Sequence, residues 1–412
     1  MLSNDSVTSS VSNRLQAAIY RESLALVDAG VADACDIDLV ITSAIGRRWA
    51  VAGPFEIWEQ IGWDLVQIIA GELYKEISNS NTPTDLPNYK PIDRLESSAE
   101  PSGSASTRFE KIAVVGAGLM GHGIALEFAS RGRQVVLHDI SEALLDDAIV
   151  RARTGLQALA SVDRISEGDV ESALARISTT TDLGEAVSNA DLVVEASSEN
   201  LELKQQIFSA IDRAALDHAI LASNSSTFVP SAYGAATQRA SRVIGVHYYN
   251  PPHLLPGVEV VKGSETSDEV VELVTREYEL IGKKPAIVQR EVQGFIGNRL
   301  QVALLREAMS IVEEGLATAL QVDEIVRQGF GRESSQVGIF EKIASATAAG
   351  EQMASKETFS QLNSDRELPR VLLEKIESND LGVKVGRGFY EWTPESAEKW
   401  RKNMADSLLH MG

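Results

Sequence analysis

The chain has 412 residues, of which 44% are hydrophobic and 24% charged, a balance typical of a globular protein with two or three domains. Its formal net charge of -21 gives no electrostatic support to a function on nucleic acids or on anionic membranes. The single cysteine, Cys35, excludes an internal disulfide. No apolar run reaches the roughly 20 residues of a membrane helix, and the polar N-terminus is not a signal peptide, so we expect a cytoplasmic protein.

The first predicted element is a helical segment whose sequence is repeated far downstream. SNRLQAAIYRE at 12–22 and GNRLQVALLRE at 297–307 are nearly the same, and Asn13 in the first corresponds to Asn298 in the second. Pairing positions 285 apart aligns the chain with itself, without a gap, for about 44 residues. A match of this length predicts a duplicated helical domain, and two copies are too few for a solenoid.

A segment rich in Ser, Ala, Gly and Pro separates the first copy from the rest of the chain. It reads ESSAEPSGSASTR at 96–108 and predicts a flexible linker. The predicted organisation is a helical domain at 1–90, a linker at 91–108, a nucleotide-binding domain at 109–293 and a second helical domain at 294–412.

Directly after the linker, the pattern of strand, glycine turn, helix and strand predicts a βαβ unit. Apolar β-type runs at 112–115 and 134–137 flank a helix-like run at 124–129. Further β-type runs at 192–194, 219–222 and 243–246 alternate with helix-like stretches. This alternation predicts a Rossmann-type, doubly wound α/β domain with a parallel sheet.

The glycine turn has the G-x-G-x-x-G pattern of dinucleotide-binding sites. Its residues are Gly116, Ala117, Gly118, Leu119, Met120 and Gly121. The pattern allows a tight turn, a close approach of the backbone to a pyrophosphate, and close packing of the helix on the sheet. Asp139 closes the second strand, where a carboxylate accepts hydrogen bonds from the adenosine ribose and repels a 2′-phosphate. We therefore predict NAD as the cofactor rather than NADP.

Three polar stretches stand at the ends of later strands. They are Ser223–Thr227, His247–His253 and the run around Glu259. His247 and Glu259 flank a proline-rich reversal between two short strands, so they can face each other. A histidine with a carboxylate partner is a suitable general base for taking a proton from an alcohol. A structural histidine explains the same spacing equally well.

Several segments together resemble the 3-hydroxyacyl-CoA dehydrogenase family, in the same order and at similar spacing. These segments are GAGLMGHGIA, ENLELK, SNSST, HYYNPPHLLPGVEVV, GFIGNRLQ and LGVKVGRGFYEW. The resemblance spans residues 109–393, and residues 12–90 resemble the C-terminal helical domain of that family a second time. The NPPHL segment is similar to the members that act on small hydroxy acids, the L-carnitine dehydrogenase and lambda-crystallin types.

The resemblance implies roles for individual residues. His247 matches the catalytic base and Glu259 the residue that orients it. Ser226 and Asn298 match the residues that bind the substrate oxygen. Additional cofactor-side or supporting contacts are implied for Glu199, Lys204, Asn224 and Asn250. The six histidines show no paired ligand spacing, so we predict no metal.

The predicted reaction is NAD-dependent oxidation of the 3-hydroxyl of an L-3-hydroxyacyl thioester, bound to CoA or to a carrier, or of a related 3-hydroxy acid. The alternatives are a carnitine- or gulonate-like oxidation of a small polar hydroxy acid and a non-catalytic, crystallin-like protein. CoA-dependent members of the family place lysines on the helical excursion after the second strand. That segment, at 142–164, offers Arg151 and Arg153 but no lysine, which weakens the case for binding of a CoA phosphate.

Two interpretations of the N-terminal copy stay open. In this family the helical domain is the dimerisation element, so the copy is expected to pack on its twin as an internal pseudo-dimer, with further homo-oligomers possible. Only the N-terminal copy has the RWAVAGPFE loop at 48–56, typical of carnitine-type members, whereas its twin reads ESSQVGIFE at 333–341. Arg48 and Trp49 in this loop therefore either bind an anionic substrate or belong to a purely packing element.

Overall fold

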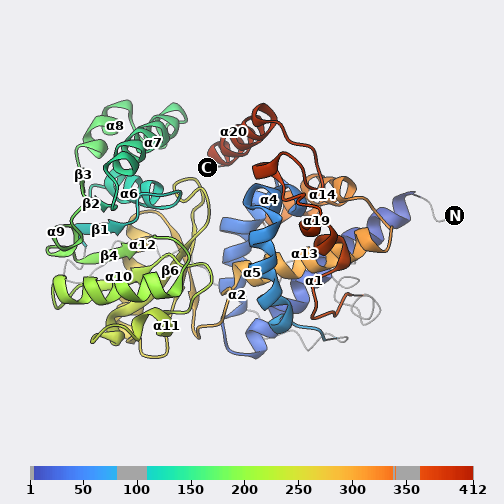
Figure 1. Cartoon of the computed structure of the whole chain (residues 1–412), viewed down its shortest axis with the longest axis horizontal. Coiled ribbons are helices and arrows are strands. Elements are labelled where there is room, and N and C mark those ends of the chain that lie inside the picture. The colour runs from blue at the N-terminus through green and yellow to red at the C-terminus, as the bar shows by residue number, and fades with distance from the viewer. Residues whose placement is uncertain (1–3, 81–108, 337–338, 340–361, 412) are drawn as a thin grey trace. The chain divides into compact units, whose positions relative to one another are not determined.

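The computed structural model describes residues 4–80, 109–336, 339 and 362–411, so the predicted linker at 91–108 lies outside the described residues. The chain divides into two compact units. One, the helical unit, combines Met1–Pro91 with Ile296–Met411, and the other, the sheet unit, is Ile92–Phe295. The two copies of the repeat thus belong to the same unit (Figure 1).

The sheet unit is built on eight strands in the order β3-β2-β1-β4-β5-β6-β7-β8. The strands are β1 (Lys111–Val115), β2 (Gln134–His138), β3 (Ile177–Thr180), β4 (Leu192–Glu195), β5 (Ile220–Ser223), β6 (Val243–Tyr248), β7 (Gly257–Val261) and β8 (Lys284–Val288). Strands β1 to β6 are parallel to one another, and β7 pairs antiparallel with β6 and parallel with β8. The predicted doubly wound fold is confirmed, with the correction that the sheet is mixed. The proline-rich reversal after β6 is too short for the crossover that a parallel pair requires.

Helices cover both faces of this sheet. They are α6 (Gly121–Ser130), α7 (Glu142–Ser161), α8 (Glu167–Leu174), α9 (Leu183–Val187), α10 (Leu201–Ala214), α11 (Pro230–Gly234), the 3-10 turn η3 (Ala240–Arg242) and α12 (Asp268–Leu280). A buried cluster joins β1, β4 and β5 to α9, α10 and α11 on one face. On the other face Phe128 of α6 meets Tyr278 of α12, with ring centroids 5.8 Å apart. Strand β3 is not among the predicted runs, because only its first residue is buried.

The helical unit contains both copies of the repeat. The N-terminal copy comprises α1 (Asn4–Asp28), α2 (Ala34–Val40), the π-helical turn η1 (Ile41–Ile45), α3 (Gly46–Trp49), α4 (Pro54–Ile61) and α5 (Trp63–Glu76). The C-terminal copy comprises α13 (Gly297–Glu313), α14 (Ala319–Gln328), α15 (Phe330–Ser334), α19 (Arg370–Glu377), the turn η4 (Val383–Val385) and α20 (Pro394–His410). Because α1 begins at Asn4, Asn13 lies in the interior of a helix, unlike its counterpart Asn298 at the start of α13. No helix in these described segments is long and apolar enough to cross a bilayer.

Helices α1 and α13 pack against each other through two equivalent buried ion pairs. Arg14 of α1 lies 2.6 Å from Glu307 of α13, and Arg299 of α13 lies 2.7 Å from Glu22 of α1. Arg14 and Arg299 are corresponding residues of the two copies, as are Glu22 and Glu307. The contact is therefore repeated with the roles of the copies exchanged, which is the pattern of a two-fold, isologous interface.

The same exchange extends beyond these ion pairs. Glu307 accepts a hydrogen bond from the backbone N–H of Asn363 at 2.8 Å, and Glu22 accepts one from that of Ser78, the corresponding residue. Elsewhere, a Cβ on Gly46 would lie 2.2 Å from the carbonyl oxygen of Ser334, and one on Gly331 would lie 2.3 Å from that of Trp49. A side chain at either glycine would force α3 and α15 apart, so both positions need glycine.

The copies also exchange structural elements. Asp323 of α14 accepts hydrogen bonds from the backbone N–H groups of Phe55 and Glu56, at 2.8 and 2.9 Å, and so caps α4 of the other copy. The buried Glu59 of α4 in turn accepts from the backbone of Phe389 and from the indole of Trp392, both in the closing segment of the C-terminal copy. The N-terminal copy therefore supplies a helix that the C-terminal copy packs around.

We predict that Arg14→Met will destabilise the protein strongly, because it leaves the buried carboxylate of Glu307 without its ionic partner. The expected loss in free energy of unfolding is about 3–5 kcal/mol, measured by urea denaturation. Arg153→Met is the matched control, because its ion pair with Glu171 is exposed and should contribute nothing measurable. Equal stability of the two variants would contradict a structural role for the Arg14–Glu307 pair.

Candidate active site

The glycine turn lies between the end of β1 and the start of α6. Gly116 has φ of +110°, a conformation that side chains disfavour. A Cβ on Gly121 would lie 1.7 Å from the carbonyl oxygen of Gly116, whereas one on Gly118 would meet no atom within 4 Å. The turn is therefore closed on the protein side and open at Gly118, which fits the approach of a pyrophosphate. Leu119 is 65% exposed and Met120 half-buried at this opening.

Two side chains fix this turn. Asp139, at the end of β2, accepts a hydrogen bond from the backbone N–H of Ala117 at 2.9 Å. Arg151 of α7 donates to the carbonyl oxygens of Ala117 and Gly118, at 2.9 and 3.1 Å. The sequence predicted Asp139 as an acceptor for the adenosine ribose, but it predicted neither this contact with the turn nor that of Arg151. Nothing in a helical pattern shows that a side chain reaches another loop. Strands β1 and β4 are neighbours here, where the strand order reverses, which is the usual position of a nucleotide site in such sheets.

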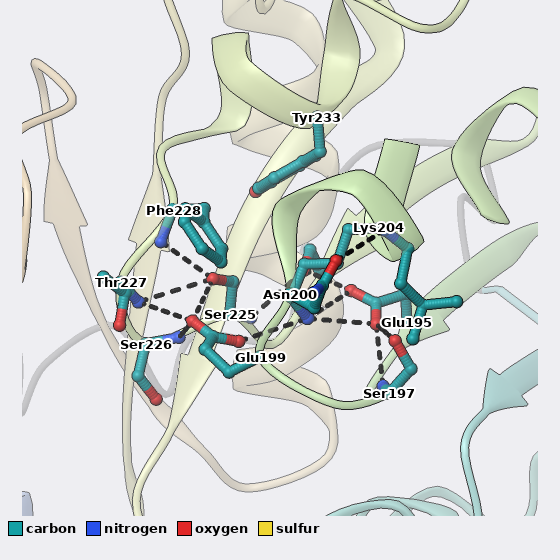
Figure 2. Close-up of polar contacts among 12 residues, drawn as sticks. Glu195, Ser197, Glu199, Asn200, Lys204, Ser225, Ser226, Thr227, Phe228 and Tyr233 are labelled. Atoms are coloured by element: carbon teal, nitrogen blue, oxygen red, sulfur yellow. Dashed lines mark hydrogen bonds and ion pairs between the residues drawn. The ribbon is translucent and has the colours of Figure 1, made fainter. Parts of the chain in front are cut away.

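A buried polar network lies at the ends of β4 and β5 (Figure 2). The ammonium of Lys204 lies 3.0 Å from Glu195 and 3.3 Å from Glu199, and Lys204 and Glu195 are almost fully buried. The carboxylate of Glu195 also accepts hydrogen bonds from the hydroxyls of Ser197 and Ser223, both at 2.5 Å. A buried charge is stable only when it is paired in this way, so the network fixes the ends of the two strands relative to each other.

Glu199 holds the loop that carries Ser226. One of its carboxylate oxygens accepts hydrogen bonds from the Ser225 hydroxyl at 2.6 Å and from the backbone N–H groups of Ser226 and Thr227 at 3.1 and 2.9 Å (Figure 2). The three contacts order the backbone on both sides of Ser226. The predicted site residues Glu199, Lys204 and Ser226 are thus brought together.

His247 and Glu259 face each other across the antiparallel pair β6–β7. They are register partners, and the imidazole Nδ1 lies 2.5 Å from a Glu259 carboxylate oxygen. Both side chains are buried. Because an ionised carboxylate only accepts hydrogen bonds, Nδ1 carries the proton and Nε2 is the basic nitrogen of the neutral ring.

Further aromatic and polar groups surround this pair. The hydroxyl of Tyr249 donates to the same Glu259 oxygen at 2.7 Å, and the ring of Phe295 lies 5.6 Å from that of His247. The side-chain oxygen of Asn224 accepts from the backbone N–H of Tyr248 at 2.9 Å, which joins the end of β5 to β6. Sequence reasoning missed Tyr249, although its two-residue spacing from His247 places both on one face of the chain.

The reversal between β6 and β7 is fixed by a buried lysine. Lys283 donates to the carbonyl oxygens of Pro252 and Leu255, at 2.5 and 2.9 Å, and pairs with Glu127 at 2.8 Å. Asn250 lies in this reversal, exposed and followed by a cis peptide bond to Pro251.

Burial affects two other histidines near these loops. Burial lowers the pKa of His253 to about 3, so that its ring stays neutral near pH 7. Burial also lowers the pKa of His122, whose Nδ1 lies 3.0 Å from the carbonyl oxygen of Gly118. His122 is a residue of α6, and His253 lies in the reversal between β6 and β7.

The remaining predicted site residues belong to the helical unit. Asn298 is the second residue of α13, half-buried, and its side-chain oxygen lies 3.5 Å from Nε2 of Gln301. Trp49 is buried, with its ring 6.3 Å from that of Phe330 in the C-terminal copy. Its burial favours the packing interpretation for this residue, and a substrate role for Arg48 and Trp49 stays a prediction.

A Rossmann-type domain with a glycine turn open to a pyrophosphate defines the class of dinucleotide-binding proteins. The NAD-binding domain of 3-hydroxyacyl-CoA dehydrogenase matches residues 111–292, and the C-terminal domain of 3-hydroxyacyl-CoA dehydrogenase matches twice, at 11–98 and at 294–392. The chain belongs to the 3-hydroxyacyl-CoA dehydrogenase family. The predicted resemblance, NAD as the cofactor and an oxidoreductase activity are thereby confirmed.

The related proteins have names that give different substrates. The chain is 32% identical to 5-formyl-3-hydroxy-2-methylpyridine 4-carboxylate 5-dehydrogenase of Mesorhizobium japonicum, over 72% of this chain and 96% of that protein. A solved structure of a 5-dehydrogenase of that name, described as an NAD+-dependent dismutase, aligns with a TM-score of 0.67 and 31% identity, over 73% of this chain and 96% of that one. L-carnitine dehydrogenase of Oceanobacillus iheyensis is 31% identical, over 66% of this chain and 86% of that protein.

We predict that Asp139→Ala will weaken NAD binding about tenfold. The turn loses its hydrogen bond at the backbone N–H of Ala117, and the ribose hydroxyls lose the predicted charged acceptor. Removal of the carboxylate also removes repulsion of a 2′-phosphate, so the preference for NAD over NADP should fall. Isothermal titration with both nucleotides measures the two effects. Asp146→Ala, on the exposed side of α7, is the matched control. Unchanged discrimination in the Asp139 variant would remove this residue from the cofactor site.

Proposed function

We propose that the protein oxidises the 3-hydroxyl of an L-3-hydroxyacyl thioester, bound to CoA or a carrier, or of a related 3-hydroxy acid, to the 3-keto product. The observation that carries this proposal is the buried His247–Glu259 pair, in a domain that the family match identifies as NAD-binding. NAD supplies the hydride acceptor when it is bound, and Gly116, Gly118, Gly121 and Asp139 would hold it.

His247 is proposed as the general base. With Nδ1 directed to Glu259, Nε2 accepts the proton of the substrate hydroxyl while the C–H bond at the same carbon breaks. The ring then becomes an imidazolium, and the carboxylate 2.5 Å from Nδ1 stabilises its charge. Glu259 therefore favours both the correct tautomer before the reaction and the charged ring after proton transfer.

Two further residues are proposed to orient the substrate oxygens. Ser226 lies in the loop that Glu199 orders, so its hydroxyl starts from a fixed backbone position. Asn298 is proposed from its place in the GFIGNR motif at the start of α13. Donors held in advance stabilise a developing charge without a reorganisation cost.

A second candidate substrate class is a small polar free hydroxy acid. Helix α7, on the excursion after β2, has two arginines and no lysine. Arg153 pairs with Glu171, and Arg151 is held by carbonyl oxygens of the glycine turn and by Asp147 at 2.7 Å. Binding a CoA phosphate through either arginine would cost an existing interaction, which favours a substrate without that phosphate.

The proposal is tested by following NADH formation with 3-hydroxybutyryl-CoA, free 3-hydroxybutyrate and L-carnitine in parallel. We expect turnover with at least one of the three, and a 10²- to 10⁴-fold lower kcat in His247→Gln on that substrate. His218→Gln is the matched control, because His218 is an exposed histidine of the same unit. Full activity of His247→Gln would exclude His247 as the base, and turnover of L-carnitine alone would favour the second substrate class.

We also propose that the N-terminal copy replaces a partner subunit within one chain. The exchanged ion pairs Arg14–Glu307 and Arg299–Glu22 support this, because equivalent residues meet as they do in a symmetric homodimer. In this account the N-terminal copy is a packing element. Because it is covalently attached, its surface is present at a high effective concentration near the C-terminal copy.

Deletion of residues 1–95 tests the proposal, because it would expose the face of α13 that α1 covers. We expect the truncated chain to self-associate through that face, and light scattering should report a higher association number than for the full chain. Residues 1–95 added as a separate polypeptide should reverse the change. An association state that is the same with and without the segment would refute the internal pseudo-dimer.

A further inference from the structure

We propose that Tyr249 is a positioning residue of the active site, which sets the strength of the His247 base through Glu259. The proposal rests on the assignment of His247 as the base. The observation behind it is a shared contact. A single oxygen of the Glu259 carboxylate contacts both Nδ1 of His247, at 2.5 Å, and the hydroxyl of Tyr249, at 2.7 Å. Two donors therefore compete for the same negative charge.

The backbone places this hydroxyl on the catalytic side of β6. His247 and Tyr249 are two residues apart, so their side chains leave the same face of the chain, and their ring centroids lie 5.0 Å apart. Tyr248, between them, leaves the opposite face, where its ring meets that of Tyr278 at 5.6 Å and the ammonium of Lys283 at 5.4 Å. The side chains of Tyr248 and Tyr249 thus lie on opposite faces of the chain.

The buried surroundings strengthen the contact between the phenol and the carboxylate. Glu259 is fully buried, and His247 and Tyr249 are almost so. On the next strand, β8, the register partner of Glu259 is the apolar Ala286. Phe295 contacts the imidazole by its ring, and the charged Lys283 is directed to carbonyl oxygens of the reversal. A hydrogen bond in such a setting is stronger than in water.

The consequence for the base follows from charge. A phenol that donates to the carboxylate withdraws negative charge from the side facing His247, so the imidazolium is less strongly stabilised. Removal of the phenol should therefore strengthen the pairing of the imidazolium with Glu259 and make proton release from the ring harder. The same hydrogen bond prevents the carboxylate from rotating away from Nδ1, because the oxygen is held from two directions.

The test is the pH profile of kcat/KM for Tyr249→Phe, with the substrate that the full-length enzyme turns over. Removal of the hydroxyl should move the acid limb of the profile to higher pH by about half to one unit. We expect kcat on the high-pH plateau to fall about three- to tenfold, with the KM for NAD unchanged. Tyr248→Phe, which removes the neighbouring buried hydroxyl from the other face, should leave the acid limb in place.

A second substitution tests the proposal in the opposite direction and keeps the tyrosine shape. Incorporation of 3-fluorotyrosine at position 249 provides a more acidic phenol and a stronger donor, so the acid limb should move to lower pH. It also serves if Tyr249→Phe does not fold. An acid limb that stays at the wild-type pH in both variants would overturn the proposal.

Failure of this inference is distinguishable from failure of the proposed function. If Glu259→Gln and His247→Gln both abolish the acid limb or the activity while the Tyr249 variants match the wild type, the base assignment holds and only the role of Tyr249 is wrong. If His247→Gln retains the wild-type profile, the base assignment itself is wrong.

Discussion

The antiparallel pairing of β7 with β6 is the constraint on which the proposed catalytic arrangement depends. In a sheet whose other neighbouring strands run parallel, this one reversal brings two side chains from the same stretch of chain face to face. A parallel crossover would have moved Glu259 to a different register and separated it from His247 by a helix. Because the pair is positioned by main-chain hydrogen bonds on both strands, its geometry depends little on mobile loops.

The reversal has its own internal support. Burial lowers the pKa of Lys283, and the cost of keeping an ammonium there is offset by two carbonyl oxygens and the carboxylate of Glu127. Lys283 follows α12, its two carbonyl partners belong to the turn, and Glu127 belongs to α6. The lysine therefore connects the turn to α6 and to the segment after α12. The fold thus uses one buried charge to hold the turn and another, on Glu259, to hold His247, the proposed base. Neither charge is exposed to solvent.

The sequence predicted those parts of the fold and site that follow from local patterns. Apolar runs separated by a glycine turn predicted the doubly wound domain, and the spacing around the proline-rich reversal placed His247 opposite Glu259. Strand β3 and the contacts of Arg151 and Tyr249 were not predictable in this way. A strand with one buried residue has no periodic signal, and the direction of a long side chain depends on neighbours brought together by the fold. The role of Glu199 shows the same limit, because the motif predicted its presence at the site but not its hydrogen bonds to the Ser226 loop.

The two copies of the helical repeat agree at the residues of two contacts between them and differ in loops elsewhere. The α1–α13 and α3–α15 contacts are matched on both sides: each copy contributes one arginine and one glutamate to the buried pairs, and one glycine to the close contact of α3 with α15. The loops outside these contacts differ, as at Arg48–Glu56 and its counterpart at 333–341. Symmetric contacts need matched residues, because a change on one side leaves a buried charge or a clash on the other. A single attached nucleotide-binding domain imposes no such symmetry, so Asn298 of α13 and its counterpart Asn13 of α1 need not have the same role.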